Sequence, residues 1–172
     1  MEITELIKSK RSIKKYQNKP VEHPLIEQIV EAGIYAPSGR NGQNVKMLVV
    51  ENKELVQQIA KINASILGID TDPFYGAPVV IVVFANRNCS TYMEDGSLVM
   101  ANLMLEAHLL GVDSCWIHRA KETFETPDGR KLAKEWGIPD EYIGIGNCIL
   151  GYHAGSYPNP SPRKSDRVYY IK

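Results

Sequence analysis

A short basic segment near the amino terminus carries the first residue types that could do chemistry. Lys10, Arg11, Ser12 and Lys14 place three cations and one hydroxyl within five residues. A phosphate group is bound by charge-assisted hydrogen bonds from Lys and Arg and by hydroxyl donors, so this segment is a candidate phosphate site. A solvated basic turn is the alternative interpretation of the same residues.

A second candidate is the polar loop at residues 37–44. Ser38, Asn41 and Gln43 offer donors and acceptors that suit the imide and carbonyl edge of a heterocycle, and the loop glycines let a backbone approach a flat ligand. No Gly-Lys-Ser or Gly-Lys-Thr sequence follows, so this is not a Walker A loop. An exposed polar loop without a ligand is the alternative.

Other reactive residue types show no catalytic or metal-binding pattern. The four histidines lack ligand spacing, so we expect no metal site. Cys115 and Cys148 lie in apolar segments typical of core thiols, and Ser38 lacks the Gly-x-Ser-x-Gly setting of a hydrolase nucleophile. Three widely spaced cysteines without a CxxC pair, and no signal-peptide pattern, favour a reduced cytoplasmic location.

The elements that must position these residues alternate between helices and strands. Helices are expected at 4–9, 24–35, 53–67, 96–110 and 126–136, with Thr4 and Thr126 as N-caps of the first and last. Strands are expected at 47–51, 78–85, 112–117, 142–152 and 167–171. The apolar run at 78–85 indicates a strand buried on both faces. This alternation predicts helices layered on a central sheet.

Length and charge set the broad class of the protein. The 172 residues fit one domain spanning 1–172. The net charge is zero, which argues against nucleic-acid binding through bulk charge, and no segment is long and apolar enough to span a membrane. The charges are unevenly distributed along the chain. Residues 1–20 carry six basic and two acidic residues, and residues 163–172 carry four basic and one acidic residue. The basic ends need a separate explanation.

Taken in order, these segments resemble the FMN-dependent nitroreductase family. The motifs are Arg-Ser-Ile-Lys at 11–14, Ala-Pro-Ser-x-x-Asn-x-Gln at 36–43, Asn102 with Leu-x-Ala at 105–107, Gly-Val-x-Ser-Cys-Trp-Ile at 111–117, Gly-Ile-Pro at 137–139, Gly-Tyr at 151–152 and a basic tail after prolines. The ordered set spans nearly the whole chain and is more specific than any single motif. The chain is similar to the short, single-domain members.

The resemblance implies an α+β fold. It is a three-layer α/β/α arrangement with a mixed, largely antiparallel central sheet. The working unit is an intertwined homodimer with FMN bound between the subunits. Lys10, Arg11 and Ser12 would hold the FMN phosphate and ribityl chain, with Lys10 standing where the family usually has arginine. Lys14 would lie near the N1/O2 edge of the flavin and tune it.

The resemblance implies further cofactor contacts elsewhere in the chain. His118 and Arg119 would lie beside the isoalloxazine, and Arg163 and Lys164 would be a second pair of phosphate-binding cations. The residues that would meet the flavin from the partner subunit are Pro37, Ser38, Asn41 and Gln43. On this interpretation both basic ends of the chain meet one FMN phosphate.

The implied activity is that of an oxidoreductase. Hydride would pass from NAD(P)H to the flavin N5 and then, in ping-pong order, to a nitroaromatic, a quinone or another small electron acceptor. The cofactor does the chemistry, so no catalytic protein residue is expected. Two alternatives stay open. One is a non-catalytic flavin-binding or redox-sensing protein, and the other is an offshoot that consumes its flavin or dehalogenates an aromatic compound.

Overall fold

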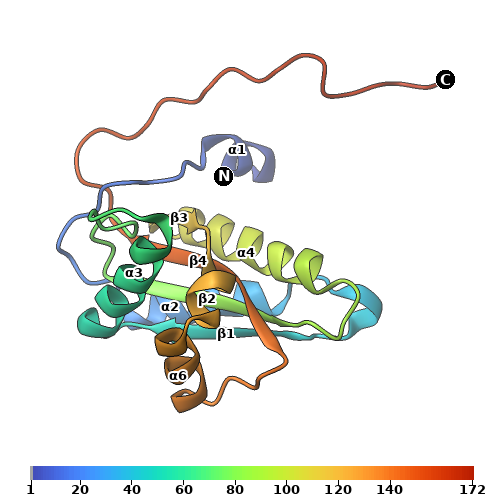
Figure 1. Ribbon diagram of the computed structural model, residues 1–172. Helices are drawn as coiled ribbons and strands as arrows, with labels where there is room; N and C mark the ends of the chain where they lie inside the picture. The colour runs from blue at the N-terminus through green and yellow to red at the C-terminus, as the bar shows by residue number, and fades with distance from the viewer. Residues whose placement is uncertain (1) are drawn as a thin grey trace.

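The computed structural model describes residues 2–172, which form a four-stranded sheet between two layers of helices (Figure 1). The helices are α1 (Ile3–Ser9), α2 (His23–Ile34), α3 (Lys53–Leu67), α4 (Tyr92–Leu109), α5 (Ala120–Glu125) and α6 (Pro127–Glu135), with a 3-10 turn η1 at Gly39–Asn41. The strands are β1 (Val45–Val50), β2 (Val79–Asn86), β3 (Asp113–Ile117) and β4 (Tyr142–Gly151).

The strand order is β1-β2-β4-β3, and each neighbouring pair is antiparallel. β2 begins opposite Leu150 of β4, which also pairs with Ser114 of β3. Near its other end β2 pairs Ala85 with Val45, the first residue of β1. Within residues 2–172 the only parallel pairing is an isolated bridge between Ser12 and Ser114. β1 and β3 are therefore the two edges of the sheet.

The core lies on both faces of the sheet, because successive side chains of a strand point to opposite sides. One face of β2 packs against α3, α5 and α6, and the residues it contributes are Val80, Val82 and Phe84. The other face packs against α2 and α4 through Val79, Ile81 and Val83. All six are fully buried or nearly so. This confirms the prediction of a strand buried on both sides and gives the three layers.

Local signals fix two of the helices that cover the sheet. The hydroxyl of Thr126 accepts a hydrogen bond from the backbone N–H of Gly129 at 3.0 Å, which confirms the predicted N-cap of α6. The side chain of Asn52 caps α3 by accepting from Leu55 at 3.0 Å. Gly68 ends that helix at φ 68°, a left-handed conformation that glycine adopts without strain.

Several predicted boundaries are wrong. α1 begins at Ile3, so Thr4 lies inside it and is not its cap. α4 begins four residues earlier than expected, at Tyr92. Gly96 suggested a helix boundary, but it is a packing glycine, since a Cβ there would lie 2.6 Å from Cγ1 of Ile145. α5 was not expected, because six residues are too few to show helical periodicity.

The predicted strand at 167–171 is also wrong. Residues 168–172 have no regular structure and are exposed, and the chain after residue 157 leaves the body as an extended arm (Figure 1). An alternating pattern forms a strand only where a neighbouring strand supplies hydrogen-bond partners, and none lies beside the arm within the described residues. No helix of residues 2–172 is long and apolar enough to cross a membrane.

Candidate functional site

The first candidate segment, just after α1, folds into a group of cations that have no acidic partners among the described residues. The Nζ of Lys10 lies 3.4 Å from the Sδ of Met104, a weak acceptor. Burial of this half-exposed ammonium lowers its pKa below the ordinary value. The ion pairs formed by residues 2–172 include none with Lys10, Arg11 or Lys14. The site therefore holds positive charge that the chain itself does not neutralise.

Arg11 is held by backbone atoms, which leaves part of its guanidinium unused. Its Nη1 donates to the carbonyl oxygens of Lys8, at 2.6 Å, and Lys10, at 2.8 Å. Its Nε is buried and has no hydrogen-bond partner in the described chain. Its backbone N–H donates to the hydroxyl of Tyr157 at 3.2 Å, so the start of the carboxy-terminal segment lies against this site.

The segment then joins the edge strand β3. The N–H of Ile13 donates to the carbonyl of Ser114 at 3.1 Å, beside the bridge between Ser12 and Ser114. Ser12 is exposed, whereas Ser114 is 2% exposed and its Oγ has no partner among residues 2–172. Buried polar atoms are normally hydrogen-bonded, so a hydroxyl without a partner beside unpaired cations is suited to binding an anionic or polar group.

A hydrogen-bonded cluster of Ser9, His108 and Tyr157 lies next to these cations. His108 of α4 lies 2.8 Å from Oγ of Ser9 through Nε2, and its ring stacks on Tyr157. Burial is the main cause that lowers the pKa of His108. The negative charge of Asp113 opposes this shift, and the positive charges of Lys10 and Arg11 add to it. His108 is therefore expected to be neutral near pH 7, and a neutral ring adds no further positive charge.

The segment after β3 is fixed by two buried amides. The carbonyl of His118 accepts from Nδ2 of Asn63 at 2.8 Å and from Nδ2 of Asn147 at 3.4 Å. Arg119 follows in a left-handed conformation at φ 67°. His118 and Arg119 line a cavity of about 210 Å³ with Tyr92 at the start of α4. They lie four to five residues beyond Ser114 on the same sheet edge, roughly 13 Å away along the strand.

The polar loop at 37–44 folds tightly. The hydroxyl of Ser38 accepts from the N–H of Gln43 at 3.0 Å, and Gln43 Nε2 donates to Asn41 Oδ1 at 3.2 Å. Pro37, Ser38 and Gln43 line a small cavity of about 120 Å³ beside β1. Asn41 and Gln43 are exposed, so their amides are accessible to a ligand.

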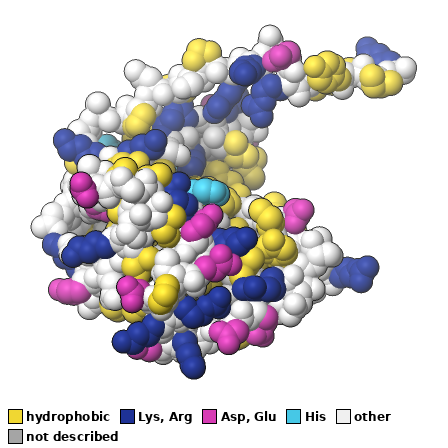
Figure 2. Space-filling view, viewed as in Figure 1, with side chains coloured by type: hydrophobic (Ala, Val, Ile, Leu, Met, Phe, Trp, Pro, Cys, Tyr) yellow, Lys and Arg dark blue, Asp and Glu magenta, His cyan; other side chains and the backbone are white. Residues whose placement is uncertain are grey.

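The structure does not bring all predicted residues together in one chain. The loop precedes Val45, at the β1 edge, whereas Ser12 bridges to Ser114 at the β3 edge and the opposite end. The separation is roughly 20 Å along the strands and about 14 Å across them. Arg163 and Lys164 lie on the exposed arm, which Figure 2 shows standing away from the body with basic side chains on it and on the surface below.

A comparison with known proteins identifies the family of the chain. The sequence profile of the Nitroreductase family matches residues 7–152. The chain belongs to the nitroreductase family.

Solved nitroreductases share its fold. One from Bacteroides fragilis with bound FMN matches with a TM-score of 0.92 at 25% identity, over the whole of both chains. One from Desulfitobacterium hafniense with bound FMN matches with a TM-score of 0.89 at 26% identity, over all of this chain and 99% of the other. A Methanothermobacter thermautotrophicus protein with the provisional name NADH dehydrogenase/NAD(P)H nitroreductase is 28% identical over all of this chain and 88% of its own length. The predicted family and fold class are confirmed.

Sequence reasoning missed four polar residues that lie beside the predicted residues. Ser114, Asn63, Asn147 and Tyr157 contact or adjoin the predicted residues, yet none stands in a polar motif. Ser114 and Asn147 lie in apolar strands, where an isolated polar residue that is buried calls for a partner. That signal was visible in the sequence but did not identify the partner.

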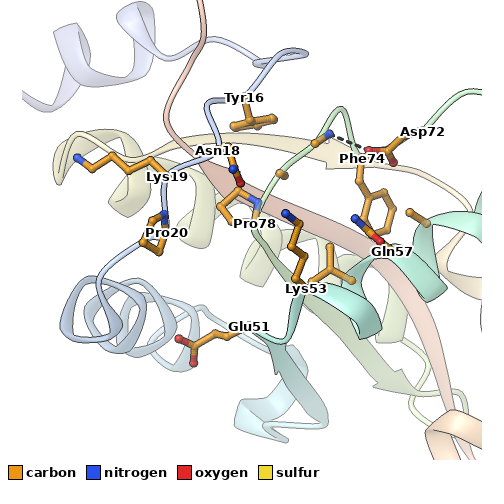
Figure 3. A pocket seen from close by; sticks show the side chains of 14 residues that line it. Tyr16, Asn18, Lys19, Pro20, Glu51, Lys53, Gln57, Asp72, Phe74 and Pro78 are labelled. Atoms are coloured by element: carbon orange, nitrogen blue, oxygen red, sulfur yellow. Dashed lines mark hydrogen bonds between the residues drawn. The ribbon is translucent and has the colours of Figure 1, made fainter.

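Another cavity of this nitroreductase-family chain, of about 490 Å³, lies between the loop after α1, the start of α3 and the segment before β2 (Figure 3). None of the twelve predicted residues lines it. Its carboxylates are already engaged, since Glu51 lies 2.9 Å from Nδ1 of His23 and Asp72 accepts from the N–H groups of Phe74 and Gly76. The described residues hold no cluster of three His, Cys, Asp or Glu side chains suited to a metal.

Proposed function

We propose that this chain is an FMN-dependent oxidoreductase that uses NAD(P)H to reduce a nitroaromatic, a quinone or another small electron acceptor. The observation that carries the proposal is the group of cations at the β3 edge, which form no ion pair within residues 2–172. Beside them, Nε of Arg11 and Oγ of Ser114 are buried and have no partner in that part of the chain. Family membership and the FMN in the two solved nitroreductases support it. As a single domain spanning 1–172, the chain would be half of the working unit.

The unused donors fit a phosphate. Lys10 supplies a half-buried charge, Arg11 an unpartnered guanidinium nitrogen, and Ser12 and Ser114 supply hydroxyls. Each is a donor, and a phosphate offers only acceptors at neutral pH, so binding would satisfy them together. Arg163 and Lys164 would add two cations from the arm, whose exposure leaves them free to approach the same anion.

The flavin ring would lie further along the same edge, between the cations and the turn at His118 and Arg119. FMN, when bound, supplies hydride chemistry, accepting from NAD(P)H and giving to the acceptor. Lys14 would place a cation near the N1/O2 edge, where it stabilises negative charge. The buried amides of Asn63 and Asn147 would keep the turn beside the ring rigid.

The remaining contacts require a second copy of the chain. Residues that bind one small cofactor have to converge, and the loop at 37–44 lies at the opposite edge and end of the sheet from the cations. We therefore assign Pro37, Ser38, Asn41 and Gln43 to the flavin of the partner subunit in a homodimer.

The surface of the chain supports this dimer. α4 exposes apolar side chains on the side away from the sheet, with Met93 59%, Leu98 42% and Leu109 51% exposed. Burial of these apolar side chains by a second copy of the chain would remove their surface from water. The arm carries Tyr169, Tyr170 and Ile171, which are at least 83% exposed and available to a partner. The three free cysteines agree with the proposed cytoplasmic location.

An absorption spectrum of the isolated protein, before and after anaerobic addition of NADH and then NADPH, tests the proposal. We expect a yellow protein whose released flavin is FMN, bleached by at least one coenzyme and re-oxidised by a quinone or nitro compound. Colourless protein that takes up no added FMN would overturn it. A bound flavin that resists reduction would favour the redox-sensing alternative, and loss of the flavin during turnover would favour the flavin-consuming one.

A further inference from the structure

The polar loop at 37–44 adopts an unusual backbone. Arg40, Asn41 and Gln43 have φ of 53°, 53° and 50°, in the left-handed region that non-glycine residues rarely occupy. Three such residues within four positions persist only when contacts from outside the loop hold them. Its internal hydrogen bonds, from Gln43 to Ser38 and from Asn41 to the Ser38 carbonyl, tie the loop only to itself.

Outside contacts hold the loop at two places. Its last residue, Asn44, accepts from the N–H of Asn86 at the end of β2 at 3.0 Å, and its start is held by Asp95, in the first turn of α4. Its side chain is buried, at 2% exposure. Oδ1 accepts from the backbone N–H of Gly39 at 2.9 Å, and Oδ2 accepts from the hydroxyl of Thr91 at 3.1 Å. Gly39 packs so closely on Thr91 that a Cβ at residue 39 would clash with the threonine side chain. The loop is thus tied to the start of α4 by one carboxylate.

Burying a carboxylate without a cation is costly, and no ion pair in residues 2–172 includes Asp95. Its hydrogen bonds go to the loop and to the helix turn below the loop, not to the core. The buried carboxylate of Asp95 therefore stabilises the conformation of the loop. The side chains it presents, Asn41 and Gln43, remain exposed.

We propose that Asp95 is a positioning residue that holds the loop in its flavin-binding conformation and that it acts on the active site of the partner subunit. The inference rests on the proposed function, because it takes the loop as a flavin contact. It adds a residue whose carboxylate oxygens are engaged by Gly39 and Thr91. Asp95 acts through Gly39, and the sheet geometry places its effect across the dimer.

The first test compares Asp95→Ala with Asp95→Asn and with Glu94→Ala, an exposed acid on the same helix turn. Trypsin cleavage after Arg40, in the exposed loop, reports loop order without any cofactor. We expect Asp95→Ala to be cleaved several-fold faster than wild type and to bind FMN at least about tenfold more weakly. Asparagine keeps the acceptor for Gly39, so Asp95→Asn should recover most of both properties. Glu94→Ala should match wild type.

The second test asks which site is affected. Asp95→Ala subunits and Lys10→Met/Arg11→Met subunits, carrying different tags, are co-expressed and the heterodimer is purified. If Asp95 acts across the interface, one site has both intact halves, so one FMN per dimer binds with wild-type affinity and about half of the turnover returns. If it acts within its own chain, both sites are defective and nothing returns.

The outcomes separate the two proposals. Wild-type protein that binds no FMN defeats the proposed function, while the proteolysis arm still reports on the loop. If Asp95→Ala is cleaved at the wild-type rate and binds FMN with wild-type affinity, the positioning role is overturned. Heterodimers without recovered binding overturn the action on the partner's site.

Discussion

The ammonium of Lys10 faces the thioether of Met104, with Nζ 3.4 Å from Sδ. A thioether is a weak acceptor, so this charge is half-buried with little compensation, which lowers its pKa. An arrangement that penalises the folded protein when nothing is bound is typical of a binding site. The loss of folding stability caused by the Lys10 charge should be measurable in the flavin-free protein.

We expect Lys10→Met to raise the stability of the flavin-free protein and to weaken FMN binding at least tenfold. Methionine removes the uncompensated charge and fills a similar volume. For a chain of this size each 1 kcal/mol shifts Tm by about 2–4 °C. Thermal melts with and without FMN would show a higher starting Tm and a smaller FMN-dependent rise. A lower starting Tm would contradict the destabilising role.

The pH dependence of stability and of FMN affinity tests whether the charge of Lys10 causes both effects. Because burial lowers the pKa of Lys10 in the folded protein below its unfolded value of 10.5, the charge destabilises the fold fully at pH values below the folded pKa. This destabilisation disappears as the pH rises from the folded pKa to 10.5. Only the charged form attracts phosphate, so wild-type FMN affinity should fall in the alkaline range as Lys10 deprotonates. Lys10→Arg, whose guanidinium stays charged, should keep its affinity there. An identical fall in both proteins would assign the effect to another group.

Lys14→Ala and Asn41→Ala should weaken FMN retention or slow flavin reduction without unfolding the protein. Both side chains are exposed, so their loss leaves the core intact. Loss of a charge-assisted contact to the flavin should cost about tenfold in affinity or rate. Stopped-flow reduction and flavin fluorescence measure the two effects. Lys131→Ala, on the distant helix α6, is the matched control, and wild-type behaviour of both variants would remove these site assignments.

Asn63→Ala should destabilise the fold by about 1–3 kcal/mol, because it removes the 2.8 Å hydrogen bond to the carbonyl of His118 inside the core. Asn147→Ala should cost less, since its bonds to the carbonyls of Ile117 and His118 are longer, at 3.3 and 3.4 Å. Denaturant unfolding of both variants and the double variant would show coupling. Gln57 is exposed on the same helix as Asn63, so Gln57→Ala should change the free energy of unfolding little. If the losses of the two single asparagine variants simply add in the double variant, the two amides are not coupled through the His118 carbonyl.

Cys89 should be the thiol that alkylating reagents modify near neutral pH. Hydrogen bonds from Thr91 lower its pKa, whereas burial raises the pKa of Cys115 and raises that of Cys148 to about 12. Since the thiolate is the reactive form, mass spectrometry after brief iodoacetamide treatment should find one modified cysteine. Thr91→Val should slow the reaction, and all three thiols should react in urea. Equal rates in the native protein would refute the assignment.

The sequence by itself determined the elements whose signals are local. The apolar run of β2 and the Thr126 cap of α6 depend on neighbouring residues, and the structure has both. The strand expected at 167–171 fails because a strand depends on a partner strand, and its alternation says nothing about whether one is near. The order of the motifs likewise determined the family.

The tertiary structure alone decided which polar residues work together. The run of Lys10, Arg11, Ser12 and Lys14 is visible in the sequence. That these cations form no ion pair within residues 2–172 depends on everything that folds around them. Asp95 resembles any acid in a first helical turn until the fold brings Gly39 to it. Burial and convergence arise from contacts between distant segments, so the chemistry of a polar residue is set by what surrounds it.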